Sequence, residues 1–552
     1  NRRYDIVYGD VMLNFNYNIN RFDIAATVGW TGRYENMNNI RVSTNGGLVT
    51  ENWFDLNASR YTPSSTLQRM ELLKTGYMGT LSLGWDNYLF LELTGRQERS
   101  STLKDQSFFY PSTNLSFLFT QAFHMPSWWN YGKLRLSYGI VGNAPETYTA
   151  NIVYEQGSDN GFTWNTIPSS WGNADIRPEK KYEYEIGLES KFLNNRLGID
   201  VSYYNNRVKD QILSTPQPST SGVKNVLMNV GEVANHGWDI SISATPILTR
   251  DFRWDLTANY GVYKNKVVKL ADGVPYLEIL NSGGSGIKIQ AVEGQPMGDI
   301  YAQVPQVNEN GEYLVSDKGL YLNQTELQKV GNINPAGVGG LFNSFSYKNV
   351  FLDFSIDFRI GGDVINEMNQ YATAVGLTPE SLKYRDTEHG GLSYYYPGDN
   401  NSSGIPVQVD PSTGAGPNGE IIYHDGIILP GVVASTGERN TRIIPAGYYY
   451  NTTYNWGTEA EQLTYRHSVF DNSYVKLREL TIGYQFPEKM ISKLGLGRLS
   501  VSVFGRNLFY FYKALKNYDA ESSVGTSWAN QATVGSSTTA TRSFGVSLRA
   551  SF

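Results

Sequence analysis

The segment that decides the fold is at the end of the chain, residues 543–552, SFGVSLRASF. Every second residue from Phe544 to Phe552 is apolar, and Gly, Ser or Arg stands between them. An alternation with a period of two is typical of a β-strand that has one apolar and one polar face. The run is longer than the usual strand of about 5–6 residues. It matches the ~9–11 residues with which a tilted strand crosses a bilayer.

The same alternation recurs along the chain and predicts an all-β, transmembrane, antiparallel β-barrel. Aromatic residues such as Trp30, Trp85, Trp128 and Trp238 gather near the ends of these segments, as expected of an interfacial belt. In residues 475–486 the alternation changes phase between Leu477 and Leu480, which predicts a β-bulge. We expect about fifteen strands, at residues 11–19, 22–32, 76–84, 88–98, 113–121, 131–140, 181–190, 196–208, 238–246, 252–263, 340–349, 351–361, 474–486, 498–507 and 542–552.

Composition agrees with this fold and excludes several classes of function. The 552 residues include 39 Tyr, 24 Phe and 11 Trp, whereas charged residues make up 18% and cysteine is absent. Disulfide scaffolds and cysteine-ligated metals are therefore excluded. The net charge of -6, without a run of Lys and Arg, gives no indication of nucleic-acid binding. The mean hydropathy of -0.37 fits a membrane barrel, in which only alternate residues face lipid.

The connections between the expected strands alternate between short and long. Short turns are expected near Asn20, Asp86, Asn194, Thr249 and Lys348. Barrels of the outer membrane have short periplasmic turns and long external loops, so Phe552 is expected at the periplasmic side. An odd strand count that begins with a downward strand leads us to expect further strands upstream of Asn1, because an open sheet edge in lipid is costly. We expect the whole chain, residues 1–552, to form one portion of a barrel. Its long external loops are expected at residues 33–75, 141–180, 264–339, 362–473 and 508–541.

Several motifs resemble the SusC/RagA family of TonB-dependent outer-membrane transporters. Residues 472–487 (NSYVKLRELTIGYQFP) resemble the family's penultimate hairpin, and residues 504–522 (FGRNLFYFYKALKNYDAES) resemble the segment that follows it. Residues 330–366 and 293–302 (EGQPMGDIYA) are also similar to family segments, and the order along the chain is the family's.

The resemblance implies a barrel of about 22 strands around an N-terminal plug. The present chain would supply strands 8 to 22, without the plug and the TonB box. The resemblance implies that the protein lies in the outer membrane of a Gram-negative bacterium, where it contacts outer-membrane lipid. Its partners would be a SusD-like surface lipoprotein that forms a lid, and the TonB complex through the missing N-terminal part. Two such transporter–lipoprotein pairs would form a dimer. The implied function is import of bulky nutrients, either oligosaccharides or peptides.

Two sets of residues are candidates for functional sites. Charged residues on the polar face are expected to line the lumen, where they solvate the wall, pair with the plug or touch a substrate in transit. Aromatic residues of the external loops are expected to stack on substrate or to pack against a partner or one another. The lumen set is Arg135, Asp200, Arg253, Asp255, Asp353, Asp357, Arg359 and Arg549, and the substrate-binding set is Trp164, Trp171, Tyr395, Trp456 and Trp528.

The sequence contains no motif typical of a catalytic site, so we do not expect an enzyme. The five His residues are scattered without metal-ligand spacing. Asn308, Asn310 and Asp317 are a partial echo of a calcium loop, and a plain turn is the stronger interpretation. No other cofactor is expected. A structural barrel that scaffolds a larger envelope assembly is the alternative function, whereas a passive porin is disfavoured because so wide a barrel needs a plug.

Overall fold

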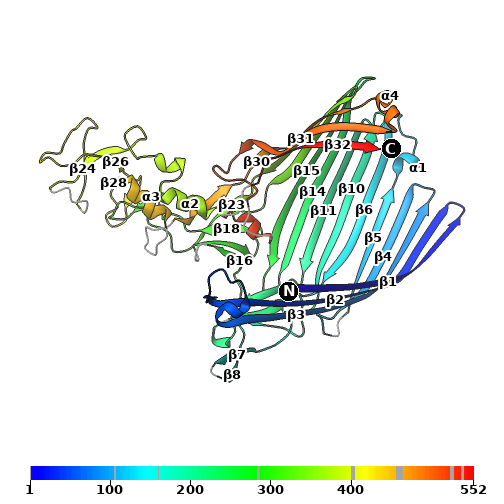
Figure 1. The fold of residues 1–552 in the computed structure, drawn as a ribbon, viewed down its shortest axis with the longest axis horizontal. Helices are drawn as coiled ribbons and strands as arrows, with labels where there is room; N and C mark the ends of the chain where they lie inside the picture. The colour runs from blue at the N-terminus through cyan, green and yellow to red at the C-terminus, as the bar shows by residue number, and fades with distance from the viewer. Residues whose placement is uncertain are drawn as a thin grey trace. The chain divides into compact units, whose positions relative to one another are not determined.

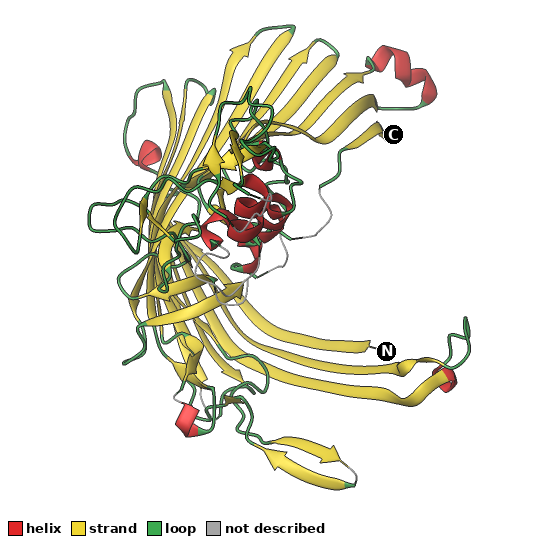
Figure 2. Cartoon of the chain, turned by 90° about the vertical axis from the view of Figure 1, so that its left-hand side faces the viewer, coloured by secondary structure: helices red, strands yellow, loops and turns green. Residues whose placement is uncertain are grey.

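The computed structural model describes residues 2–104, 107–159, 161–217, 219–282, 286–398, 404–455, 464–522, 527–535 and 540–551. Its main element is an antiparallel sheet of 15 strands that follow one another in chain order (Figure 1). Figure 2 shows how few and short the helices are. The strands are β1 (Arg2–Ile19), β2 (Phe22–Leu48), β3 (Ser59–Trp85), β4 (Leu89–Ser100), β5 (Ser107–Phe117), β6 (Trp129–Asn143), β10 (Glu179–Phe192), β11 (Leu197–Lys209), β14 (Glu232–Leu248), β15 (Phe252–Lys269), β21 (Gly337–Tyr347), β22 (Val350–Ile360), β30 (Tyr474–Gln485), β31 (Arg498–Lys513) and β32 (Ser543–Ser551).

All fifteen expected strands are present, in the expected order. The expected loop at 33–75 was wrong, because β2 and β3 are each 27 residues long and pair from Phe22↔Trp85 to Leu48↔Ser59. Only residues 49–58, with a short 3-10 helix η1 (Leu56–Ala58), connect them. The Asn- and Ser-rich outer half of this hairpin lacks the apolar alternation, because neither of its faces needs to contact lipid there.

The strand ends fall into two groups. At one end of the sheet, which we call the turn end, short connections join neighbouring strands; the opposite end is called the loop end. The short connections are residues 20–21, 86–88, 193–196, 249–251 and 348–349. Two further turn-end connections carry short helices, α1 (Phe119–Ala122) and α4 (Glu488–Ile491). Asn20, Asp86, Asn194 and Lys348 have positive φ angles of 53–57°, a conformation that Asn and Asp tolerate better than most residues.

The chain divides into two compact units, which we describe separately: residues 1–244 with 263–275, and residues 245–262 with 276–552. In the first unit, the register places apolar side chains side by side across nine strands. The next positions along each strand form a polar row on the opposite face. The apolar row is Tyr17, Ile24, Leu83, Leu91, Leu115, Leu136, Ile186, Tyr203 and Trp238.

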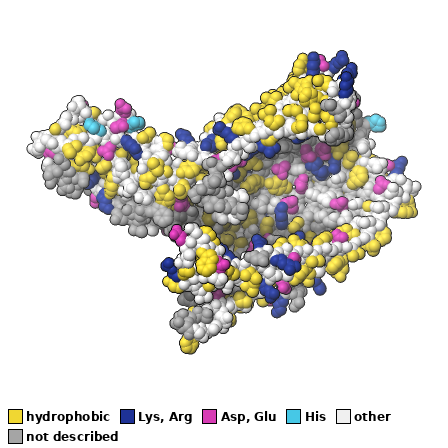
Figure 3. Space-filling model, in the orientation of Figure 1, with side chains coloured by type: hydrophobic (Ala, Val, Ile, Leu, Met, Phe, Trp, Pro, Cys, Tyr) yellow, Lys and Arg dark blue, Asp and Glu magenta, His cyan; other side chains and the backbone are white. Residues whose placement is uncertain are grey.

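The second unit has the same two faces. Its apolar row is Trp254, Phe345, Leu352, Ile482, Val503 and Val546. Val503 and Val546 are 58% and 72% exposed, and Figure 3 shows hydrophobic side chains gathered over β31 and β32. Such a continuous exposed apolar face is the surface that a bilayer would cover. No helix in the described parts of the chain is long and apolar enough to cross a membrane.

The predicted β-bulge in residues 475–486 is confirmed. The pairing of β22 with β30 shifts at this point, because Ile356 pairs with Leu477 whereas Ser355 pairs with Glu479. Arg478 is therefore the extra residue. The pairing of β30 with β31 also shifts between Leu477 and Glu479. Both halves of β30 consequently keep their apolar residues on one face.

The loop-end connections of both units contain local structure of their own. In the first unit, β7 (Glu155–Asp159) and β8 (Phe162–Thr166) form a hairpin, and β9 (Ser170–Trp171), β12 (Ile212–Pro216) and β13 (Asn225–Asn229) form a small sheet. In the second unit, β16 (Tyr276–Ser282), β17 (Ile287–Val292), β18 (Asp299–Ala302) and β20 (Gln328–Asn332) form a sheet over a buried aliphatic cluster. Farther along lie α2 (Glu367–Ala374), β24 (Leu392–Tyr395), β25 (Val407–Gln408), β26 (Tyr423–Ile427), β28 (Ile444–Pro445) and α3 (Ala446–Tyr454).

Candidate functional site

On the polar face of the first unit, Arg135 is the centre of a charged cluster. Its guanidinium lies 2.6 Å from Asp200 and 3.5 Å from Glu189, and it also donates to the Ser202 hydroxyl at 3.2 Å. These residues come from three neighbouring strands, β6, β10 and β11. The structure thus brings together the predicted residues Arg135 and Asp200, and they neutralise one another on a surface that remains partly exposed.

A recess of about 670 Å³ opens on the same face of β1–β5. Asparagine and serine side chains form much of its lining, together with two carboxylates, Asp23 and Glu92. The Asn114 amide donates to Glu92 at 3.2 Å. Amides, hydroxyls and carboxylates at this density can hydrogen-bond a polar chain or a polar protein segment. The lining residues that carry this chemistry are Asn16, Asn18, Asp23, Ser82, Glu92, Asn114 and Ser116.

In the second unit, Arg253 and Asp255 also form a predicted pair. The Arg253 guanidinium donates to both oxygens of Asp255 at 2.5 and 3.0 Å, and Asp255 also accepts a hydrogen bond from Thr245 at 2.7 Å. The polar face here therefore has the same self-neutralised character as the face in the first unit.

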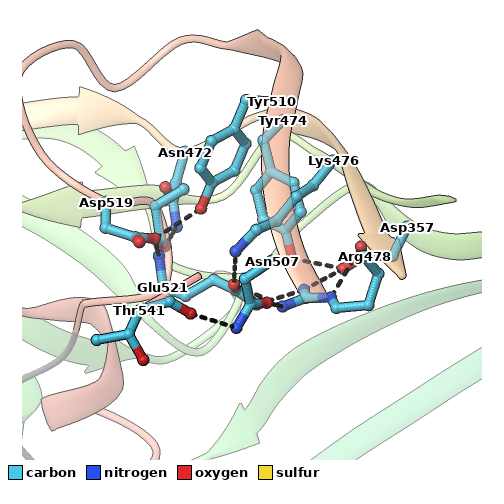
Figure 4. A network of polar contacts seen from close by, with 11 residues as sticks. Asp357, Asn472, Tyr474, Lys476, Arg478, Asn507, Tyr510, Asp519, Glu521 and Thr541 are labelled. Carbon is cyan, nitrogen blue, oxygen red and sulfur yellow. Dashed lines mark hydrogen bonds and ion pairs between the residues drawn. The ribbon is translucent and has the colours of Figure 1, made fainter. Parts of the chain in front are cut away.

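The densest polar network lies at the loop end of β22, β30 and β31 (Figure 4). Lys476 is the most enclosed member, with 2% of its side chain exposed, and its Nζ lies 2.5 Å from Glu521. Arg478 donates to both oxygens of Glu521 at 2.8 and 2.6 Å. It also forms a second ion pair with Asp357. One carboxylate from a loop and one from a strand thus hold two cations of the bulged strand.

The surroundings of this network hold its members in position. The Lys476 ammonium lies 4.7 Å from the centre of the Tyr510 ring, close enough for a cation–π contact. The Tyr510 hydroxyl donates to Asp519 at 2.6 Å, and Asn472 donates to the Ala520 carbonyl at 2.9 Å. Burial would raise the pKa of Glu521, but hydrogen bonds from Arg478 and Lys476 hold that pKa below its usual range. The network ties residues 519–521 to the wall.

Three other predicted lumen residues have different surroundings. Arg359 donates to the backbone carbonyls of Gly361 and Ile333 at 3.2 and 3.0 Å, so it fastens connecting segments to the end of β22. Asp353 pairs in register with Ser344 and Thr481 on the polar face. Arg549 is exposed on β32.

The predicted loop aromatics lie in separate elements. Trp164 stands on β8 beside Gly157 of its own hairpin, whereas Trp171 contacts Tyr154 edge to face at 5.7 Å. Tyr395 ends β24, and Trp528 lies against Gly298. Trp456 lies outside the described residues, as does Phe552. Within either unit, the described members do not converge on a single pocket.

The loop end offers little acid–base or metal chemistry. His467 stacks on Tyr454 at 4.4 Å, and burial, with Arg466 nearby, lowers the pKa of His467 to about 4. Asn308 Oδ1 accepts hydrogen bonds from the backbone N–H groups of Asn310 and Glu312, and so closes a turn. Among the described residues, no group of three or more His, Asp or Glu side chains could hold a metal ion.

The sequence indicated Asp357 but not Lys476, Arg478 or Glu521. The change of phase near Arg478 was a usable signal, because a bulge can redirect a side chain. The position of Glu521 depends on the path of a connecting segment, which alternation does not reveal.

A sheet with one lipid-facing side and one polar, ion-paired side defines a membrane-spanning barrel wall. A family model described as "TonB dependent receptor-like, beta-barrel" matches residues 1–292. The chain therefore belongs to the TonB-dependent receptor-like β-barrel family, whose members are outer-membrane transporters and receptors. This membership confirms the family prediction and the expectation that the chain is not an enzyme.

Individual relatives agree with this assignment. TonB-dependent receptor P3 of Formosa agariphila is 24% identical over 494 residues, which are 81% of this chain and 42% of that protein. TonB-dependent receptor SusC of Bacteroides thetaiotaomicron is 30% identical over 247 residues, or 41% of this chain and 24% of that protein. The chain thus spans less than half the length of these relatives.

A structure of the RagAB peptide transporter has the same fold. It superposes with a TM-score of 0.68 at 19% identity, and the match covers 94% of this chain and 54% of that one. At this identity, the similarity establishes the shared architecture alone.

Proposed function

We propose that this chain is the barrel portion of a TonB-dependent importer of a bulky nutrient, either an oligosaccharide or a peptide. The observation that carries the proposal is the polar, ion-paired face of the sheet in a chain of this family. In a completed barrel of about 22 strands, that face would line the lumen. Ion pairs such as Arg135–Asp200 would keep the wall wetted without presenting a strong net charge to the cargo.

The proposal includes a SusD-like surface lipoprotein as a partner and TonB as the source of energy. It is supported by the relatives, one of which is named SusC and another RagAB. The loop aromatics Trp164, Trp171, Tyr395, Trp456 and Trp528 would contact cargo or this partner. A dimer of transporter–lipoprotein pairs is part of the same proposal, whereas no cofactor is needed for transport.

The proposal is tested by uptake in cells. The complete gene, with or without its lipoprotein partner, is supplied to a strain that lacks it, and growth is measured on oligosaccharides or peptides as the sole nutrient. We expect growth on one class of nutrient, and loss of that growth when TonB is deleted. Uptake that persists without TonB would contradict an energised importer. A barrel that forms normally but supports no uptake of either class would favour the scaffold alternative.

The loop end is proposed to face the outside of the cell and the turn end the periplasm. Because the chain contains no cysteine, single cysteines can report this orientation. Glu309 lies in an exposed loop-end turn, and Arg250 lies in an exposed turn-end connection. Each is replaced by cysteine in a separate variant, Glu309→Cys and Arg250→Cys. A membrane-impermeant maleimide should label Glu309→Cys on intact cells, and Arg250→Cys only after permeabilisation. The reverse labelling pattern would contradict the orientation.

A further inference from the structure

Basic side chains of three strands, β10, β11 and β15, gather on the apolar, outward side of the sheet, on both sides of β14. On β11, Ile199, Val201 and Tyr203 face outward. Arg207 and Lys209 have the same parity in the alternation, so they lie on this outward face near the loop end. On β15 the alternation from Trp254 carries Lys264 and Lys266 to the same side, where both are exposed. Lys180 of β10 completes the group, which we call the outer basic cluster: Lys180, Arg207, Lys209, Lys264 and Lys266.

The cluster lies where the lipid-facing band ends. Tyr182, Tyr203 and Trp238 share its outward face and stand one or two outward positions closer to the middle of the sheet. Aromatic residues of this kind lie at the level of the lipid headgroups. Leu197, at the turn end of β11, is ten residues from Arg207. At ~3.3 Å per residue and a tilt of about 40°, this separation corresponds to ~25 Å along the membrane normal. Arg207 is therefore at the edge of the hydrocarbon layer.

Like charges face each other in this cluster without full internal compensation. Lys180 and Lys209 are direct cross-strand partners, an arrangement that destabilises a sheet unless a counter-charge is near. The Glu232 carboxylate lies 3.0 Å from Arg207 but 4.0 Å from Lys209. Among the described residues, Lys180, Lys264 and Lys266 form no ion pair. By the strand alternation, this excess positive charge lies on the outward face of the sheet.

We propose that the outer basic cluster binds the phosphate groups of a phosphorylated glycolipid in the outer leaflet. Its cations flank β14, so those on β11 and β15 are two strand spacings, or ~10 Å, apart. That span suits a headgroup with more than one anionic group, while the acyl chains would lie along the apolar rows below. Each cation near a charged lipid surface contributes about 1 kcal/mol to such binding. The inference rests on the orientation given under Proposed function.

The test compares variants of the complete protein, purified from outer membranes in mild detergent. Diphosphoryl lipid A is titrated in, and the bound fraction is measured by native mass spectrometry. Lys180→Gln/Lys264→Gln/Lys266→Gln removes three cations that form no ion pair with any described residue, and we expect affinity to fall at least tenfold. The charge-preserving Lys180→Arg/Lys264→Arg/Lys266→Arg should bind as the parent does. Arg41→Gln/Arg60→Gln/Lys104→Gln, a matched loss of exposed charge elsewhere in the first unit, should also leave binding unchanged.

Two further ligands distinguish the sources of the signal. Dephosphorylated lipid A should bind weakly, and millimolar inorganic phosphate should not displace the diphosphoryl form. Equal binding of the two lipids would assign the affinity to acyl chains and overturn the proposal, as would unchanged affinity in the glutamine variant. Displacement by inorganic phosphate would also overturn it, by assigning a simple anion site. Nutrient uptake by the glutamine variant is a separate readout, so a failure of lipid binding is distinguishable from a failure of the importer hypothesis.

Discussion

Replacing Glu521 with Gln is expected to lower the free energy of unfolding by about 2–3 kcal/mol, because it leaves a buried ammonium without its counter-charge. The Lys476 side chain is only 2% exposed, and its Nζ has the Glu521 carboxylate at 2.5 Å. The carbonyl oxygen of Gln could still accept a hydrogen bond but could not balance the charge. Arg478 would retain its ion pair with Asp357, which limits the loss.

The loss can be measured from the urea midpoint at which the barrel ceases to migrate as a folded species in electrophoresis. Glu488→Gln on α4 is the matched control, because Glu488 is exposed and its substitution should change stability by less than about 0.5 kcal/mol. Adding Lys476→Met to Glu521→Gln should recover much of the loss, since the double variant no longer buries an ammonium without its counter-charge. A Glu521→Gln variant as stable as the parent would show that the pair contributes nothing.

The strands and their two faces were predictable because lipid imposes a strict period of two on them. The predicted strand at 542–552 is β32, Ser543–Ser551, and the predicted strand at 351–361 is β22, Val350–Ile360. The same reasoning placed the bulge between Leu477 and Leu480, and the strand pairing identifies Arg478 as its extra residue. Wherever a strand has lipid on one side and polar groups on the other, its sequence alternates between apolar and polar residues.

The alternation of apolar and polar residues disappears where a strand no longer contacts lipid. The outer halves of β2 and β3 still pair, from Arg33↔Lys74 outward to Leu48↔Ser59. Their pairing is held by backbone hydrogen bonds that most side chains allow, so the composition resembles that of a loop. The network around Lys476 and Glu521 could not be predicted for a related reason. It joins a strand to a connection 45 residues away, and no local pattern encodes that contact.

The loop aromatics show a further limit of the sequence. Tyr394 and Tyr396 are 1% and 5% exposed, because they pack with Tyr423 inside a local core of the connection. Trp164, by contrast, is 46% exposed. Composition alone does not separate an aromatic residue that builds a loop from one that is available to a ligand.

Val503→Arg, on the lipid-facing side of β31, is expected to lower the free energy of unfolding by about 2–4 kcal/mol if Val503 lies near the middle of the bilayer. Val503 is 58% exposed, and its neighbours across the strands are Ile482 and Val546, so an arginine there would meet hydrocarbon on every side. Ser502→Arg adds the same charge one residue away.

The two substitutions form a matched pair because only the face differs. Ser502 lies between Gly483 and Ser547 on the polar face, where water can solvate a guanidinium. We expect the Ser502→Arg barrel to remain within about 1 kcal/mol of the parent in urea unfolding from phospholipid vesicles. The Val503→Arg barrel should unfold at a clearly lower urea concentration and insert with reduced yield. If the two variants were equally stable, or if their order were reversed, the assignment of the faces of β31 would be wrong, and with it the polar lining on which the transport proposal depends.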